Sequence, residues 1–269
     1  MRAFLHRIRR GGRRLFYAGA GNDGLSGGNG LDGLLGAPGN DAVYGDAGFN
    51  YLFGGDGNDT LIGSGRTSAS DVNVMQGEAG SDHLYGRQGT NCFYGGDESD
   101  VMFGRSGLNI FISSDEFVYG DVIYGGSGRN YVYGSSANDT VTGGIGVDVF
   151  LMSFGDDIIT GGGGVDYVWG GLGTDTFSID DRTTESMVVQ DFFDDVLRAS
   201  GTSLHSFANV QAGTFYAAGI NTTIITDAAG SAVWLIGCAP GQLHSTCLVF
   251  RRARIWEAAQ LQPKASLSS

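Results

Sequence analysis

Apolar residues recur every ninth position through the first two thirds of the chain. Written as GGxGxDxUx, the repeating unit has glycine-rich positions one to five, Asp or Asn at position six and an apolar residue U at position eight. The U positions are Leu25, Leu34, Val43, Leu52, Leu61, Met75, Leu84, Phe93, Met102, Phe111, Ile123, Val132, Val141, Phe150, Ile159, Val168 and Phe177. All of them are apolar, so the repeat has a defined register.

This spacing predicts an all-β solenoid. The three residues xUx form a short strand with one side chain turned inward. The six glycine-rich residues form a turn, because glycine accepts positive φ and close backbone approach. Two units then close one coil of about 18 residues, and successive coils stack as two parallel sheets.

The pattern divides the chain into four parts. A basic segment at 1–17 contains one eroded repeat, "RRGGRRLFY", and the regular repeats occupy 18–178. Insertions at roughly 64–71 and 114–118 interrupt the repeats, as solenoids tolerate. A β-rich cap is expected at 179–250, and a basic tail follows at 251–269.

Composition narrows the function. The chain has 48 glycines and a net charge of −13, and residues 18–178 carry 21 acidic residues against four basic ones. This charge argues against nucleic acid as a partner and leaves cations as the natural ligand. No apolar run has the ~20 residues of a membrane span. Three cysteines are too few for a disulfide framework, although Cys238 and Cys247 could pair.

The sixth position sorts by the parity of the repeat. Because two repeats make a coil, alternate repeats stack on the same edge. One edge is entirely Asp: Asp23, Asp41, Asp59, Asp82, Asp100, Asp121, Asp139, Asp157 and Asp175. The other edge reads Asp32, Asn50, Asn73, Asn91, Asn109, Asn130, Asp148 and Asp166.

Stacked carboxylates and turn carbonyls predict several Ca²⁺ sites. Carboxylates about 4.8 Å apart repel by roughly 1 kcal/mol in water and about 3–4 kcal/mol at an effective dielectric of 20. Calcium favours an oxygen cage of this kind. The predicted ligands are the aspartates of both edges, with backbone oxygens of Gly19, Gly21, Gly28, Gly30, Gly55, Gly57, Gly144, Gly146, Gly162, Gly164, Gly171 and Gly173.

The two edges are expected to differ. We interpret the Asp edge as the calcium column and the Asn run as a calcium-poor edge that forms side-chain amide ladders. The alternative is that Asn still ligates Ca²⁺ weakly through its amide oxygen. The turns with Glu98, with "SSA" at 135–137 and with Met152 should bind less tightly. Asp115 and Glu116 either add ligands or lie in a solvated loop.

The repeats resemble those of the RTX (repeats-in-toxin) family, whose nonapeptide binds Ca²⁺. This resemblance implies a right-handed parallel β-roll in a bacterial protein that a type I system exports to the extracellular space or cell surface. The stretch 187–250 is similar to the family's serralysin-like cap, with "VVQDFFDDVLRASG" at its start, "SFANVQAG" as a short helical segment and "NTTIITDAAGSAVWLIG" as a hairpin. Arg198 stands where the family commonly has an acidic residue. The resemblance also places the secretion signal at 251–269.

The sequence matches to catalytic motifs lack the neighbouring elements that those motifs require. "GLSGG" at 24–28 matches GxSxG, but no helix follows Ser26. The four histidines form no HExxH motif. We therefore expect no enzyme activity. The alternatives are an adhesive surface protein, or the non-catalytic part of a secreted protease or polysaccharide-modifying enzyme. The chain is read either as a fragment of a larger protein or as a stand-alone binder.

A further expectation concerns one face of the solenoid. The residues that flank U on the Asn-edge sheet are largely apolar or aromatic, among them Tyr51, Tyr94, Tyr133, Tyr167 and Trp169. The opposite sheet is diluted by Thr and Ser. A contiguous apolar face usually marks an interface. The expected partner is a protein, a glycan or a second copy, and the alternative is burial under the chain's own tail.

Overall fold

The computed structural model describes residues 12–63, 69–113, 118–180, 185–200, 214–228, 230–243 and 248–251. Several expectations fall outside these ranges. They concern the basic segment up to residue 11, the tail from residue 252, the short helical segment at 206–213, Asp115 and Glu116, and Cys247, which could pair with Cys238. No helix within the described part of the chain is long and apolar enough to cross a membrane.

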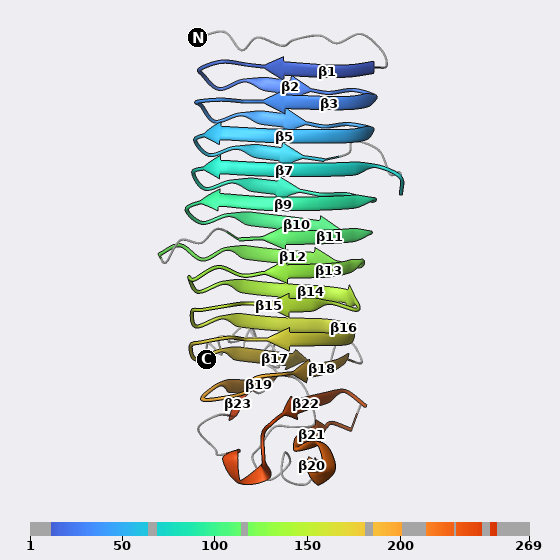
Figure 1. The fold of residues 1–269 in the computed structure, drawn as a ribbon, viewed down its shortest axis with the longest axis vertical. Coiled ribbons are helices and arrows are strands. Elements are labelled where there is room, and N and C mark those ends of the chain that lie inside the picture. The colour runs from blue at the N-terminus through green and yellow to red at the C-terminus, as the bar shows by residue number, and fades with distance from the viewer. Residues whose placement is uncertain are drawn as a thin grey trace, which may run out of the picture.

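The chain forms a tall β-roll whose coils stack from the N-terminal end downward (Figure 1). Two parallel sheets face each other across a narrow core. The sheet that follows the Asp edge, here the aspartate-side sheet, contains β2 (Gly24–Ser26), β4 (Ala42–Tyr44), β6 (Thr60–Ile62), β8 (His83–Tyr85), β10 (Val101–Arg105), β12 (Val122–Gly126), β14 (Thr140–Gly146), the first residues of β16 (Ile158–Trp169), β17 (Thr176–Asp180), β19 (Val196–Ser200) and β23 (Leu248–Arg251).

The second sheet follows the Asn edge and is called the asparagine-side sheet. It contains β1 (Gly12–Tyr17), β3 (Gly30–Leu35), β5 (Gly48–Asp56), β7 (Val72–Ala79), β9 (Thr90–Asp97), β11 (Leu108–Ile112), β13 (Arg129–Tyr133), β15 (Val149–Leu151), the last residues of β16, β18 (Glu185–Val189) and β22 (Ala232–Ile236). The all-β parallel roll is therefore confirmed.

Within the regular repeats the core is a file of single apolar residues, one from each strand, whereas β17, β18, β19 and β22 each bury two. The seventeen predicted U residues are all buried, none more than 5% exposed. Phe93 and Phe111 stack on successive coils with ring centroids 4.5 Å apart. Since each strand of the regular repeats contributes one inward apolar side chain, the core there is long but thin, and the turns on both edges must supply the remaining stability.

Many strands are longer than the three residues that the repeat predicts. β2, β4, β6, β8 and β15 have three residues, whereas β5 has nine and β16 has twelve. The extra residues are glycine-rich turn positions that also pair between coils, such as Gly126 with Gly144. The turns thus extend the parallel pairing of the strands, because their backbones stack in register from coil to coil.

Parallel stacking continues on both sides of the regular repeats. β1 pairs with β3 so that Arg14 lies opposite Asp32 and Phe16 opposite Leu34, which makes 12–17 a coil in register with the repeats. At the other end, β18, β19, β22 and β23 extend the two sheets past residue 178. The predicted hairpin is present as β21 (Thr222–Thr226) paired antiparallel with β22, and β20 (Thr214–Ala217) adds a third strand. Two 3₁₀ turns, η1 (Ala218–Ile220) and η2 (Pro240–Gln242), complete this end.

Candidate metal sites along the two edges

The aspartates of one edge form a continuous ladder, here the Asp column, which runs from Asp23 to Asp195. In each step, Oδ1 of one aspartate accepts the backbone N–H of the aspartate one coil earlier. The first two steps, Asp23 N to Asp41 Oδ1 and Asp41 N to Asp59 Oδ1, measure 2.7 and 2.6 Å. The remaining seven steps measure between 2.7 and 2.9 Å. This ladder fixes the stacking register and directs Oδ1 of each aspartate at the preceding coil.

The second carboxylate oxygen is left without a partner at most positions. Within the described residues, Oδ2 is buried and accepts no hydrogen bond at Asp41, Asp59, Asp82, Asp100, Asp157 and Asp175. These side chains are at most 3% exposed. A buried, unpaired carboxylate oxygen is costly unless a proton or cation satisfies it. The column therefore presents a row of oxygens that require a positive partner.

The first glycine of each unit makes room beside this oxygen. A Cβ added to Gly54 would collide with Asp59 Oδ2, and would lie 2.6 Å from the carbonyl oxygen of Gly77 in the next coil. The same arrangement joins Gly36 to Asp41 and the Gly54 carbonyl, and Gly77 to Asp82 and the Gly95 carbonyl. Carboxylate and carbonyl oxygens thus meet in a space that only glycine leaves open. Such oxygens suit a hard cation like Ca²⁺.

A metal ion on the Asp column would need backbone oxygens as well as carboxylates. Within the described residues, no group of three or more His, Cys, Asp or Glu side chains converges on one point. At most two side chains of these four types therefore meet at any one position in the described residues. The residues fit calcium, which accepts carbonyl oxygens readily, better than metals that need several imidazole or thiolate ligands.

Burial raises the pKa of the stacked carboxyl groups. Desolvation is the largest cause throughout, neighbouring carboxylates raise most of these values further, and the backbone N–H donors oppose both. The pKa reaches about 8 at Asp100 and Asp157. It reaches about 7 at Asp82, Asp121, Asp166 and Asp195, and about 6 at Asp59 and Asp148. The metal-free column therefore holds protons near neutral pH, and a bound cation would compete with them.

Most of the glycines predicted as backbone ligands, at positions two and four, have a visible packing role, although Gly19 and Gly21 in the first unit have open space beside them. Gly57, for example, has φ of 120°, and a Cβ there would strike the carbonyl oxygen of Gly39 in the preceding coil. Their part in metal binding remains a prediction. The sequence reasoning missed the first-position glycines, which border the unpartnered oxygens. The recurrence of that glycine at the start of most units, with Ala18 and Met152 as exceptions, was the available signal.

The other edge, here the Asn column, closes itself with amide hydrogen bonds. Asn50 Nδ2 donates to Asn73 Oδ1 at 3.0 Å, and the pattern repeats from Asn73 to Asn91, Asn91 to Asn109 and Asn109 to Asn130 at 2.9 Å. The expected amide ladder is therefore present. Each bond couples one coil to the next without any charge.

The two columns place opposite atoms in the same space. The atom beside the first-position glycine is a carboxylate oxygen on the Asp edge, but it is Nδ2 of Asn50 beside Gly45 and Nδ2 of Asn91 beside Gly86. An amide N–H₂ group is a donor and has no lone pair for a cation. This geometry favours a calcium-poor Asn run over weak ligation through the amide.

Aspartates bound the Asn column at both ends. Oδ2 of Asp148 and of Asp166 is buried without a partner, and each lies against a first-position glycine, Gly143 or Gly161. These two positions repeat the geometry of the Asp column. At the N-terminal end, the Arg14 side chain lowers the pKa of Asp32 against the larger effect of burial, and Arg14 also donates to the Gly27 carbonyl at 2.9 Å. An arginine thus provides the positive charge nearest to Asp32.

We predict that Asn91→Asp and Asn50→Asp each increase the number of bound calcium ions. The change replaces Nδ2 by an oxygen beside a first-position glycine, so the local geometry becomes that of the Asp column. It also removes one amide donor to the next coil, which costs about 1 kcal/mol in the absence of calcium. Calorimetric titration gives the count. An unchanged count in a folded variant would contradict a calcium-free Asn run.

Aromatic residues are exposed on both sheets. On the asparagine-side sheet, five aromatic side chains are between 38% and 43% exposed: Tyr51, Tyr94, Tyr133, Tyr167 and Trp169. On the aspartate-side sheet, Tyr85, Phe103 and Tyr124 form a stack with centroid separations of 5.0 Å. The expectation that aromatic residues gather mainly on the asparagine-side sheet is therefore incomplete, because the strand register also aligns rings on the aspartate-side sheet.

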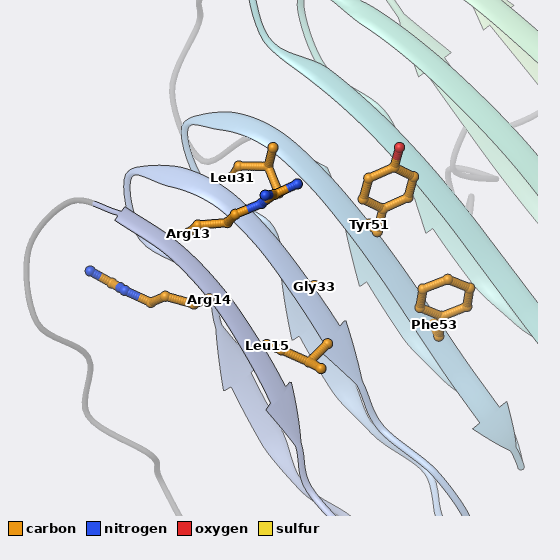
Figure 2. A pocket seen from close by; sticks show the side chains of 7 residues that line it. All are labelled: Arg13, Arg14, Leu15, Leu31, Gly33, Tyr51 and Phe53. Carbon is orange, nitrogen blue, oxygen red and sulfur yellow. The ribbon is translucent and has the colours of Figure 1, made fainter.

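A hollow opens in the asparagine-side sheet near the N-terminal end (Figure 2). It has a volume of about 460 Å³ and is lined by Arg13, Arg14, Leu15, Leu31, Gly33, Tyr51 and Phe53. Gly33 lies in register between Leu15 and Tyr51. The hollow arises because Gly33 has no side chain at a position where the neighbouring strands carry large ones.

Comparison with known proteins gives one family match. The model of the RTX calcium-binding nonapeptide repeat matches in four copies, at residues 35–65, 69–110, 118–150 and 153–177. Among solved structures, the chain is similar to the extracellular lipase LipA from Serratia marcescens, with 16% identity and a TM-score of 0.31 over 83% of this chain. The chain spans 40% of the length of that lipase. No curated protein sequence matches significantly.

Proposed function

Because this chain belongs to the RTX calcium-binding nonapeptide-repeat family and forms a parallel β-roll that binds several calcium ions, we propose that calcium binding drives its folding. The observation that carries the proposal is the row of buried Oδ2 atoms without partners on the Asp column. In the unfolded chain these carboxylates are solvated, so their burial opposes folding until a cation is bound.

The balance of energies supports calcium-coupled folding. Within the repeats the core contributes one inward apolar side chain per strand, while nine aspartates from Asp23 to Asp175 stack on one edge. Neighbouring ionised carboxylates at strand spacing repel by about 3–4 kcal/mol at an effective dielectric of 20. A ligand that binds only the folded state stabilises it by mass action. Calcium can therefore shift the equilibrium from unfolded to folded.

We further propose that the protein acts outside the cell after export by a type I system. Extracellular modules bind Ca²⁺ with dissociation constants of about 10⁻⁴–10⁻³ M, which suits sites built largely from backbone oxygens and single carboxylates. A chain that stays unfolded where Ca²⁺ is scarce is suited to passage through a narrow secretion channel. The family implies the secretion route, and the chain's basic tail remains the proposed address.

The β-roll itself is a structural, non-catalytic calcium-binding module. Its buried aspartates lie in hydrogen-bonded ladders rather than in an open cleft, which supports the proposal that the chain has no enzyme activity. The same proposal includes an alternative role. In it, the calcium-folded module is the non-catalytic part of a secreted protease or a polysaccharide-modifying enzyme.

The test of calcium-coupled folding is a calcium titration followed by far-UV circular dichroism. We expect a weak β-signal in chelator and a cooperative rise as calcium is added, with little response to magnesium because its octahedral geometry is stricter. A full β-signal in chelator would contradict the proposal. The amide ladder and core would then be sufficient to hold the roll.

A second candidate function is contact through the aromatic columns. The specific observation is that rings on neighbouring strands align in register, as Tyr85, Phe103 and Tyr124 do at 5.0 Å spacing. Such a surface suits a glycan, whose sugar rings stack on aromatic faces, or another protein. Glycan arrays and sedimentation of the calcium-bound protein distinguish the two. A monomer that binds no glycan would argue against this candidate.

A further inference from the structure

At Asp139 of the Asp column, donors from the same turn satisfy the second carboxylate oxygen. Asp139 Oδ2 accepts the backbone N–H of Ser135 at 2.9 Å and its hydroxyl Oγ at 3.3 Å. Ser135 Oγ also accepts the backbone N–H of Ala137 at 3.0 Å. Asp139 is 1% exposed, yet its Oδ2 is absent from the unpartnered oxygens of the described residues.

The backbone of this turn differs from that of neighbouring turns. The second residue of the unit has positive φ at Gly126 (99°), Gly144 (106°) and Ser153 (78°), whereas Ser135 is not among the residues with positive φ. In this differently shaped turn, the N–H of Ser135 is directed at the carboxylate in its own turn.

The space beside the first glycine is changed as well. A Cβ added to Gly134 would meet the backbone of Met152, and Asp139 Oδ2 is not among its nearest atoms. In the unit that contains Gly54, by contrast, the carboxylate oxygen of Asp59 is the nearest atom. The oxygen that elsewhere faces the open space has therefore moved to the Ser135 donors.

We propose that Ser135 takes the place of a calcium ion at Asp139 and divides the Asp column into two separate blocks of sites. The N-terminal block comprises Asp41, Asp59, Asp82 and Asp100, and the C-terminal block comprises Asp157 and Asp175. This inference rests on the proposed calcium binding of the column. Its consequence is that ions in one block load without direct contact with ions in the other.

The C-terminal end of the column uses the same device. Asp195 Oδ1 continues the ladder by accepting Asp175 N–H, and its Oδ2 accepts Phe193 N–H at 2.8 Å. Asp191 accepts the backbone N–H groups of Gly170 and Gly171, both at 2.9 Å. Backbone donors thus end the column at Asp195, just as Ser135 interrupts it at Asp139.

The first experiment counts calcium ions by calorimetric titration of the full chain. The variant Ser135→Gly with Ala137→Gly restores the second and fourth glycines of the unit, and we expect it to bind one ion more than the wild type. Ser136→Gly, between the two positions, is the matched control and should leave the count unchanged. A folded double variant with the wild-type count would overturn the inference.

A second pair of variants tests the inference even if the double glycine variant does not fold. Asp139→Asn should leave the ion count unchanged, whereas Asp82→Asn should lower it by one. Loss of an ion in Asp139→Asn would overturn the inference. A wild type that binds no calcium would instead refute the proposed function, so the two failures are distinguishable.

Discussion

Gly54→Ala is expected to prevent the central coils from folding at calcium concentrations that saturate the wild type. The added Cβ would collide with Asp59 Oδ2 and lie 2.6 Å from the Gly77 carbonyl oxygen. Neither atom can move easily, because Asp59 is held in the column ladder and Gly77 belongs to a paired strand. Overpacking of this kind costs about 3 kcal/mol. The cost is compounded by the loss of the ion, since the methyl group fills its space.

The measurement is the calcium midpoint of the far-UV signal together with the number of ions bound. Gly24→Ala is the matched control, because a Cβ at Gly24 meets no heavy atom within 4 Å and the residue has no positive φ. This control should fold at the wild-type midpoint or slightly below it. Equal midpoints for Gly54→Ala and Gly24→Ala would show that the space beside the first glycine is not a site.

The second large effect is a reversed pH dependence of the metal-free roll. Burial raises the pKa of Asp100 and Asp157 to about 8, whereas Asp in an unfolded chain titrates near 3.9. Between these values the folded state binds protons that the unfolded state has released. The free energy of unfolding therefore falls as the pH rises from about 4 to about 8, by up to about 1.4 kcal/mol per pH unit for each such proton.

The far-UV β-signal at pH 5, 6.5 and 8 in calcium-depleted buffer measures this dependence, because it reports how much of the metal-free chain is folded at each pH. We expect the greatest stability at pH 5 and the least at pH 8. In saturating calcium the order should reverse or flatten, because calcium replaces the protons and binds more tightly as they leave. A metal-free protein that becomes more stable from pH 5 to pH 8 would show that the aspartates are ionised and satisfied without calcium.

The candidate site was predictable from the repeat in its larger features. Period nine located the aspartates, and the parity of position six separated Asp59 and its neighbours from Asn91 and its neighbours. Two units of nine residues close one coil, so alternate units stack on the same edge. The sequence therefore distinguishes the two edges. The repeat also predicted that the "SSA" turn departs from the rest.

The identity of the atoms inside each turn was not predictable in this way. Asp59 and Asp139 have the same position in the repeat, but one leaves Oδ2 unpartnered and the other gives it to Ser135. The difference depends on the direction of one backbone N–H, in a turn whose second residue lacks the positive φ of its neighbours. A pattern of residue types does not specify that direction.

By itself, the sequence determined the solenoid, its register and the location of a column of carboxylates on one edge. It did so because one apolar residue and one Asp or Asn in every nine residues leave a single way to bury the former and stack the latter. Tertiary structure alone decided which oxygens lack partners, that amide nitrogens occupy the equivalent space on the other edge, and that parallel stacking continues to β23. These depend on contacts between coils, where the hydrogen-bond partner of an atom comes from a residue about 18 positions away.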